Sequence, residues 1–349
     1  HKSVILLIGM FLSSGAIAQE PLFEYIGPPD AVNLPEHAVA GQKVRVNRRA
    51  LQSPRISIEL FGETHRAVRK HIDRRKAGQT VWTGHLEGNP GNTVILTLRA
   101  NTVSGFIQNG LETYRIGASS AAGNRLFMLD LRSLPAEDVG GVPLGDGDPQ
   151  AAASMEPAAD NTVQDLLVVY NQAACDSAGG CTQLQTDIVT AVADMNSAYT
   201  ESGVNITMNL VGTAFTDYSG TGASATLSAL AGTSDGQMDE IHQVRDDLGA
   251  DIVAMVYDGQ GCGIAYSPAG PSSAFSVTDE PCLVGNRTMA HEIGHNQGAL
   301  HDRKQHGGGN VGAYNYGYRR CNDGSDEDLG TPFFRTFLTY SCSGAPRVG

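Results

Sequence analysis

The sequence lacks the features that mark several large classes of protein. No apolar stretch approaches the roughly 20 residues that a membrane-spanning helix needs, so we expect no membrane span. No C-x-x-C pair is present, which argues against a metal cluster held by cysteine thiolates. The net charge is −13 and no nucleic-acid-binding module is recognisable, so we expect no nucleic-acid partner.

Cysteine is absent before Cys175, and all six cysteines lie in the second half of the chain. An even number of cysteines in an exported protein favours disulfides over free thiols. Six cysteines allow about 15 connectivities, among which the sequence does not choose. The simplest prediction pairs neighbours: Cys175–Cys181, Cys262–Cys282 and Cys321–Cys342.

Residues 1–18 have the layout of a secretory signal peptide. One cation, Lys2, precedes an apolar run from Val4 to Leu12, and small residues follow at Ala16-Ile17-Ala18. The run is too short to span a bilayer. We therefore expect cleavage after Ala18 and secretion to the extracellular space or the periplasm.

Residues 19–158 are predicted to form a β-rich domain. β-branched and aromatic residues alternate with polar ones, which is typical of half-buried antiparallel strands. Examples of the predicted strands are Lys43–Asn47, Arg55–Leu60, Thr80–Gly84, Thr93–Leu98, Glu112–Ile116 and Leu126–Leu131. Residues 135–160 are rich in Pro, Gly, Ala and Asp, so we expect an exposed linker there.

Residues 159–349 follow a different pattern, in which continuous apolar runs alternate with stretches of helical periodicity. The predicted strands are Asp165–Tyr170, Val204–Val211 and Asp251–Tyr257, and the predicted helices are Thr182–Glu201 and Met238–Leu248. This alternation favours an α/β or α+β domain with a mostly parallel sheet. About 190 residues suffice for one core.

Charge is divided unequally between the two parts. Residues 43–132 hold 15 Lys/Arg against 6 Asp/Glu, a net +9, whereas residues 159–349 hold 8 against 22, a net −14. Opposite fields of this size favour docking of one domain on the other, less strongly as salt rises. The alternative is that the cations between Arg66 and Lys76 form a solvated basic face.

The stretch from His291 to Asp302 reads H-E-x-x-H-x-x-G-x-x-H-D. A helix over about residues 286–297 would place His291 and His295 one turn apart on one face, where both imidazoles reach a single metal ion. Glu292 would then lie beside the metal without binding it.

The glycine of this motif explains how a third ligand arrives. Gly298 follows the last helical residue, where a positive φ costs glycine little, so the chain can fold back to His301. Three neutral histidines leave a tetrahedral Zn²⁺ one open position, as in catalytic zinc sites. We predict Zn²⁺ held by His291, His295 and His301, with Glu292 as general base and Asp302 positioning His301 or forming a loop salt bridge.

The motif resembles the metzincin signature, and it is most similar to the reprolysin, or adamalysin-like, branch. Metzincins have a methionine-containing turn beneath the zinc. The segment Arg335–Cys342 resembles that turn, with Leu338 where methionine is expected and of similar volume. The resemblance implies a metzincin-like catalytic domain with a twisted mixed sheet and a zinc-binding helix. It also implies a C-terminal helix beyond Gly349.

The resemblance assigns roles to two more segments. A tyrosine at the position of Tyr340 binds zinc or stabilises the oxyanion in some metzincins; the alternative is a packed aromatic. Gly263–Tyr266 resembles the edge strand on which reprolysins bind an extended substrate, antiparallel to it. The alternative is an ordinary loop bracketed by a disulfide.

Residues 19–158 are similar in layout to reprolysin-type propeptides, so we expect the chain's own propeptide to act as its inhibitor. Because this part contains no cysteine, it cannot cap zinc with a thiolate. Inhibition would come from steric covering, helped by the charge contrast.

The segment between His301 and Leu338 holds five cations: Arg303, Lys304, Arg319, Arg320 and Arg335. The catalytic part resembles bacterial peptidyl-Asp metalloendopeptidases, which cut on the amino side of aspartate, and one of these cations could hold the substrate carboxylate. The alternative is that they offset the acidic run Asn322–Asp328. The oxygens of that run could hold Ca²⁺. Because the run lacks the spacing of known calcium-binding loops, the alternative is a solvated acidic loop.

From these patterns we expect a secreted zinc endopeptidase, made as a zymogen, monomeric, and acting on proteins or peptides. Zinc would lower the pKa of its water from about 15.7 to about 7, and Glu292 would take the proton during attack on the peptide carbonyl. Two alternatives come from other classes. One is a catalytically silent, zinc-stabilised binding or adhesion module, and the other is a zinc amidase acting on cell-wall peptides.

Overall fold

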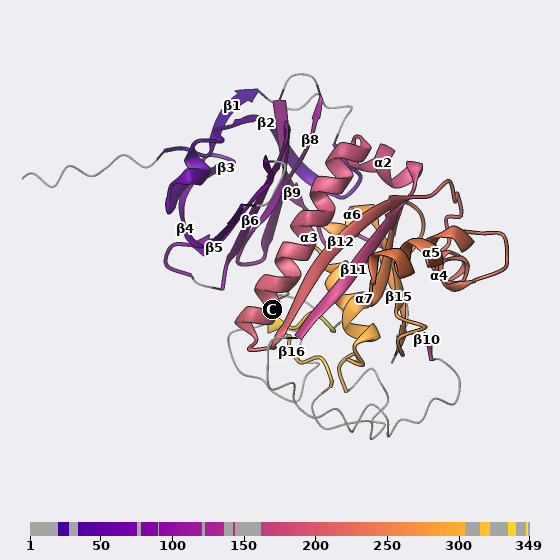
Figure 1. Cartoon of the computed structure of the whole chain (residues 1–349). Helices are drawn as coiled ribbons and strands as arrows, with labels where there is room; N and C mark the ends of the chain where they lie inside the picture. The colour runs from indigo at the N-terminus through magenta and orange to yellow at the C-terminus, as the bar shows by residue number, and fades with distance from the viewer. Residues whose placement is uncertain are drawn as a thin grey trace, which may run out of the picture.

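The computed structural model describes residues 20–27, 34–74, 78–89, 91–120, 123–135, 142–143, 162–267, 269–303, 315–321, 334–339 and 347. Two bodies lie side by side, an N-terminal barrel of strands and a C-terminal α/β region (Figure 1). The predicted signal peptide, the acidic run and Tyr340 lie outside the described residues. In the described part, no helix is both long and apolar enough to cross a membrane.

The N-terminal barrel is an antiparallel sheet that, among the described residues, has nine strands in the order β1-β2-β9-β8-β7-β6-β5-β4-β3. Its strands are β1 (Phe23–Gly27), β2 (Ala38–Val46), β3 (Arg55–Leu60), β4 (Glu63–Arg74), β5 (Thr80–Leu86), β6 (Thr93–Arg99), β7 (Thr102–Asn109), β8 (Glu112–Ser120) and β9 (Gly123–Leu129), with a 3₁₀ turn at Ala50–Gln52. Pro21 bridges Ser57 of β3, and the Leu22 amide donates to the Ser57 carbonyl at 2.7 Å. The two edges of the sheet therefore meet.

Alternating apolar residues form the core of the barrel. In β3, Ile56, Ile58 and Leu60 are buried, and they pack in one cluster with Trp82 of β5. The sequence predicted β3 correctly, along with most of β5, β6, β8 and β9. It did not single out β1, β4 and β7. β4 is rich in charged residues and β7 contains Gly105, and both features lower strand propensity.

The C-terminal α/β region contains a sheet of six described strands in the order β10-β14-β15-β13-β11-β12. The strands are β10 (Val142–Pro143), β11 (Thr162–Tyr170), β12 (Ile206–Phe215), β13 (Ile252–Tyr257), β14 (Gly263–Ser267) and β15 (Phe275–Asp279). All described pairings are parallel except β14 with β15. A small separate hairpin joins β16 (Arg319–Arg320) to β17 (Phe334–Arg335).

Helices cover both faces of this sheet. They are α2 (Gln172–Ala178), α3 (Cys181–Glu201), α4 (Ala223–Ala231), α5 (Asp239–Leu248), α6 (Glu280–Leu283) and α7 (Thr288–Asn296). Leu166 and Val168 of β11 pack with α2, α3 and α7, whereas Leu167 and Val169 pack with α4 and α5. Because side chains alternate along a strand, the continuous apolar run of β11 serves both layers. The predicted mixed α/β content is confirmed.

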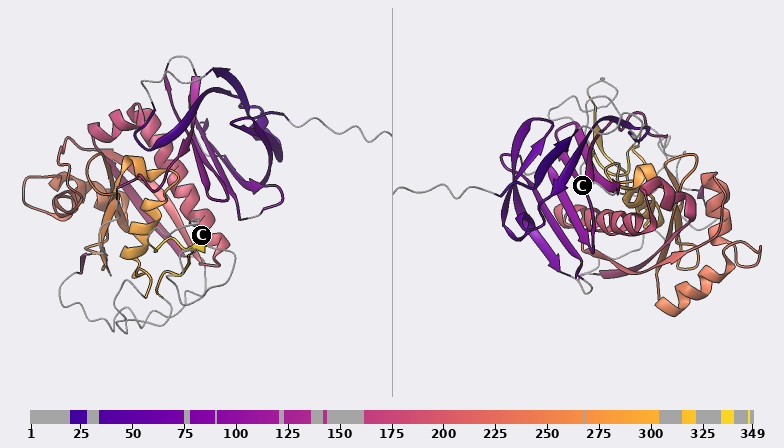
Figure 2. Two further views of the ribbon diagram at one scale, coloured as in Figure 1. Left: turned by 180° about the vertical axis from the view of Figure 1, so that it is seen from behind. Right: turned by 90° about the horizontal axis from the view of Figure 1, so that it is seen from above.

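Helix α3 lies between the barrel and the second sheet in every view (Figures 1 and 2). Its apolar stripe, including Leu184, Ile188 and Met195, joins the core of the α/β region, as its spacing predicted. The side that meets β6 and β7 is polar: Gln183 donates to the Val103 carbonyl, and Thr190 donates to Thr97. The contact between the two bodies therefore combines polar residues of α3 with apolar side chains, because Val81, Ile95 and Phe106 of the barrel belong to the same buried cluster as the core of the α/β region.

Two predicted disulfides are confirmed. Cys175–Cys181 joins the middle of α2 to the start of α3, and Cys262–Cys282 joins the residue before β14 to α6. Cys321 is also disulfide-bonded, while its predicted partner Cys342 lies outside the described residues.

Candidate active site

The three histidines of the motif converge on one point. His291 and His295 lie on α7, and His301 follows the loop after it; all three are buried. Their Nε2 atoms form a triangle with sides of 3.1 Å (His291–His295), 3.0 Å (His291–His301) and 3.0 Å (His295–His301). A tetrahedral zinc with bonds of about 2.0–2.1 Å needs nitrogens roughly 3.3 Å apart, so the triangle is only slightly tight for such an ion.

Hydrogen bonds fix the tautomers of two of these histidines. Nδ1 of His291 donates to the Phe337 carbonyl at 2.5 Å, and Nδ1 of His295 donates to the Ala299 carbonyl at 2.8 Å. When neutral, both rings therefore present a bare Nε2 lone pair to the same point. Bare lone pairs cannot hydrogen-bond to one another, so this donor set fits a metal cation, and the residues present suit zinc.

Burial keeps His291 neutral. Its pKa is lowered well below the ordinary value, first by desolvation and then by the neighbouring His295 and by Arg347. A neutral imidazole is the form that binds a metal.

The turn that brings in His301 is built as the sequence predicted. Gly298 has φ of 90°, and the Ala299 amide donates to the Gly294 carbonyl at 2.9 Å, which closes the helix end. Leu300 then pairs with Tyr316, its amide donating to the Asn315 carbonyl at 2.7 Å. The residue before the third ligand is thus held by backbone bonds.

Leu338 lies directly beneath α7, where the resemblance placed a methionine. A Cβ added to Gly294 would lie 2.9 Å from Leu338 Cδ2, so the helix and this side chain are in close contact. Phe337, whose carbonyl accepts from His291, is the preceding residue. The segment therefore supports the histidine site from below.

We expect Leu338→Met to change the free energy of unfolding by less than about 1.5 kcal/mol, because the two side chains have similar volume. Leu338→Ala should cost about 2 kcal/mol or more, since it leaves a cavity under α7. Chemical denaturation of both variants checks this. Equal losses in the two variants would contradict the role of Leu338 as a packed floor.

Glu292 is buried on α7 and packs against β14. A Cβ on Gly263 would lie 2.8 Å from both Cγ and Oε1 of Glu292, and 2.7 Å from Cγ2 of Thr288. The absence of a side chain at Gly263 therefore makes room for the carboxyl between helix and strand.

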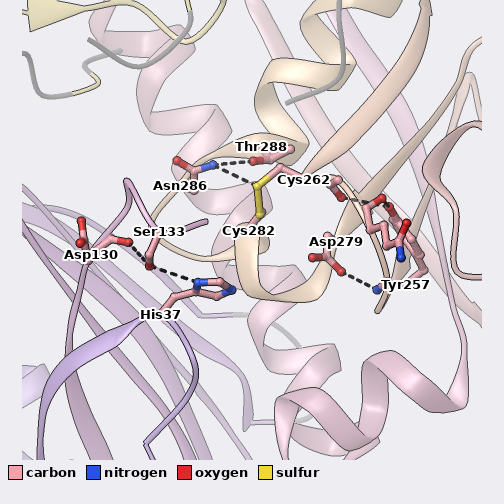
Figure 3. The surroundings of a disulfide bond; sticks show 12 residues. His37, Asp130, Ser133, Tyr257, Cys262, Asp279, Cys282, Asn286 and Thr288 are labelled. Atoms are coloured by element: carbon pink, nitrogen blue, oxygen red, sulfur yellow. Dashed lines mark hydrogen bonds between the residues drawn. A yellow bond between two sulfur atoms is a disulfide. The ribbon is translucent and has the colours of Figure 1, made fainter. Parts of the chain in front are cut away.

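Several bonds hold α7 and β14 together. Nδ2 of Asn296 donates to the carbonyls of Tyr266 and Phe275, at 2.9 and 3.0 Å. At the other end, Nδ2 of Asn286 donates both to Sγ of Cys262, the residue before β14, at 3.7 Å and to the Thr288 hydroxyl of α7 at 3.0 Å (Figure 3). The strand and the helix are thus fixed to each other at both ends.

Two buried arginines that no sequence motif indicates, Arg287 and Arg347, lie near His291. Arg347 approaches Nδ1 of His291 at 3.4 Å and donates to the Asn286 carbonyl. Arg287 donates to Asp194 of α3 at 2.9 Å, and its guanidinium lies over the Phe337 ring, 4.9 Å from the centroid. Neither contact had a local signal in the sequence, because the partners are distant along the chain.

The structure places four of the five predicted cations, since Lys304 lies outside the described residues. Arg319 lies beside Asp302, with Nε 3.7 Å from Oδ2, which agrees with a salt bridge for Asp302. Arg335 is buried and donates to the Thr339 carbonyl at 2.9 Å. Arg303 stacks over Tyr316 and Arg320 over Phe334. All four of these cations belong to the segment between His301 and Leu338.

Comparison with known proteins gives the chain its relatives. A family model of the reprolysin type, metallopeptidase family M12, matches residues 160–330. The peptidyl-Asp metalloendopeptidase of Stenotrophomonas maltophilia (strain R551-3) is 32% identical over 97% of this chain and 83% of the relative. The peptidyl-Asp metalloendopeptidase of Xanthomonas campestris pv. campestris is 30% identical over 84% of this chain and 72% of the relative.

Among solved structures, the chain is similar to metalloproteinase-II from Bacteroides fragilis, at 13% identity and a TM-score of 0.43. The match covers 71% of this chain and 81% of that one.

Family, relatives and the histidine triangle agree on the class: the protein is a zinc metalloendopeptidase. Its substrates are therefore peptides or proteins. Within that class, the chain belongs to the reprolysin-like metallopeptidases of family M12.

Proposed function

We propose that the chain is a secreted zymogen whose C-terminal region hydrolyses peptide bonds on the amino side of aspartate. The observation that carries the peptidase mechanism is the set of three buried, converging Nε2 atoms, with the Glu292 carboxyl on α7, the helix that also holds His291 and His295. His291, His295 and His301 would hold the ion. Zinc in such a site acts as a Lewis acid and lowers the pKa of water.

Glu292 would supply the proton chemistry. Its carboxylate takes a proton from the attacking water and returns it to the leaving amine. The contact with Gly263 places this carboxyl next to β14, along which an extended substrate would pair its backbone. Strand pairing orients the scissile bond, and Glu292 is fixed relative to that strand.

Metal removal tests this proposal most directly. We expect a zinc chelator to abolish cleavage of an unfolded protein by the processed enzyme, and added Zn²⁺ to restore it. Without the ion, the site loses the Lewis acid that lowers the pKa of the attacking water. The readout is peptide release, with bound zinc measured in parallel. Full zinc occupancy without turnover would instead favour a silent binding module.

The aspartate preference rests on the relatives, whose printed names are peptidyl-Asp metalloendopeptidase, and on the cations of the segment that follows His301. A guanidinium can hold a carboxylate by two charge-assisted hydrogen bonds. We expect a mixed peptide library to be cut mainly before aspartate, and before asparagine at least about tenfold less, since the amide lacks the charge. Preference for large apolar residues there would discard this specificity.

The proposal that the N-terminal part is an inhibitory propeptide has support from β10. This short strand, between the barrel and the α/β region, pairs in parallel with β14: Val142 lies opposite Tyr266 and Pro143 opposite Ser267. The sequence predicted an exposed linker here, and the family resemblance implied a substrate antiparallel to β14. A segment that pairs with β14 in the opposite direction would occupy the substrate's place without presenting a bond for cleavage.

A further inference from the structure

Arg115 of β8 carries a buried charge from the barrel into the α/β region. Its Nη2 lies 3.0 Å from Oδ2 of Asp187 on α3, and it also donates to Oε1 of Glu280 at the start of α6. The side chain of Arg115 is 14% exposed, and those of Asp187 and Glu280 are 0% and 3% exposed. One cation of the barrel therefore joins two carboxylates of the other body.

The α/β region satisfies the remaining carboxylate oxygens by itself. Gln183 donates to Oδ1 of Asp187 at 2.9 Å, and Ser177 donates to Oε2 of Glu280 at 3.1 Å. Burial, together with the neighbouring Glu280, raises the pKa of Asp187 to about 6, although the Arg115 guanidinium acts in the opposite direction and lowers it. Withdrawal of Arg115 would leave two close, poorly solvated carboxylates.

The rest of this interface differs from the Arg115 site. Thr102 and Thr97 of the barrel meet Thr186 and Thr190 of α3 at 2.7 and 2.8 Å. Hydroxyls of this kind exchange readily for water, so the polar face of α3 can be solvated after separation. Val81, Ile95 and Phe106 of the barrel also pack in the core cluster of the α/β region, so apolar contacts complete the interface, and none of these contacts carries a charge.

A second ion pair crosses the same interface at its rim. Lys70 of β4 lies 2.8 Å from Oε1 of Glu201, and their side chains are 38% and 31% exposed. Exposed pairs of this kind contribute little and are screened by salt. Lys70 therefore offers a matched control for Arg115.

We propose that Arg115 is the anchor that keeps the barrel docked on the α/β region, and that the lifetime of the docked state depends on this buried contact with Asp187 and Glu280. The opposite net charges of the two bodies then govern the association rate, whereas the buried contact of Arg115 with the two carboxylates governs the dissociation rate. The role of Arg115 as the anchor of a releasable propeptide rests on the proposed zymogen.

The test uses the full chain with a specific protease site placed in residues 144–161, in a Glu292→Gln background that prevents self-digestion. After the linker is cut, the loss of the barrel from the immobilised α/β region is followed over time. We expect Arg115→Gln to release the barrel at least about 30-fold faster, at both low and high salt, because it leaves two buried charges unpaired. Lys70→Gln should change the release rate less than about threefold, and only at low salt.

Rescue distinguishes loss of the anchor from misfolding. Adding Asp187→Asn and Glu280→Gln to Arg115→Gln removes the unpaired charges, so we expect most of the docked lifetime to return. Equal effects of the Arg115 and Lys70 variants, or no rescue, would overturn the proposal. So would release of the unmodified barrel by 1 M salt as quickly as from Arg115→Gln. Because no proteolysis by the enzyme is measured, failure here is separate from failure of the proposed activity.

Discussion

Glu292→Gln should lose about 10²–10⁴-fold in kcat while its zinc content stays that of the unmodified enzyme. Glutamine has the shape of glutamate, so the packing against Gly263 and Thr288 is kept and the three histidines are undisturbed. It cannot accept a proton from water, so only the proton transfer is lost. Turnover of a peptide substrate and metal analysis of the same sample give the two readouts.

Asp279→Asn is the matched control for this experiment. Asp279 is another buried carboxyl near the disulfide of α6, and it accepts a hydrogen bond from the Gly259 amide at 2.9 Å (Figure 3). Burial raises its pKa to about 7, so much of it is neutral near that pH and an amide replaces it at little cost. We expect kcat within a few-fold of the unmodified enzyme. If Glu292→Gln behaved like Asp279→Asn, Glu292 would not be the base.

Gly263→Ala should reduce kcat by about 100-fold, because a displacement of about 1 Å in a catalytic group can cost that much. The new Cβ would lie 2.8 Å from the Glu292 carboxyl and 2.7 Å from Thr288, so Glu292 must move away from β14. The histidines lie on other positions of α7 and after it, so zinc binding should be retained. Steady-state kinetics and metal analysis check both parts.

The division between kcat and KM identifies the cause. Displacement of Glu292 lowers kcat with KM little changed, whereas damage to backbone pairing of the substrate on β14 raises KM. Gly270→Ala serves as the control, because among the described residues the nearest atom to its new Cβ would be Ser273 Oγ, at an ordinary contact distance of 3.8 Å. A raised KM with unchanged kcat in Gly263→Ala would show that this glycine acts on substrate binding and not on Glu292.

The features that the sequence predicted are those encoded within short stretches. The motif from His291 to Asp302 fixed the spacing of two ligands on one helix, and Gly298 adopts the positive φ that its position requires. The apolar stripe of α3 and the disulfides between neighbouring cysteines were equally local. Periodicity failed where a strand carries charge or glycine, as in β4 and β7, because tertiary pairing there overrides propensity.

By itself, the sequence predicted the chemistry proposed for this protein, because one turn of helix and one chain reversal suffice to bring three histidines and a glutamate together. The tertiary structure decided what surrounds that chemistry. Arg347 beside His291, Gly263 beside Glu292 and Arg115 between Asp187 and Glu280 join residues 29 to 165 positions apart in the chain. Such contacts depend on how whole sheets and helices pack, because burial and the pairing of buried charge are properties of the assembled fold and not of any single segment.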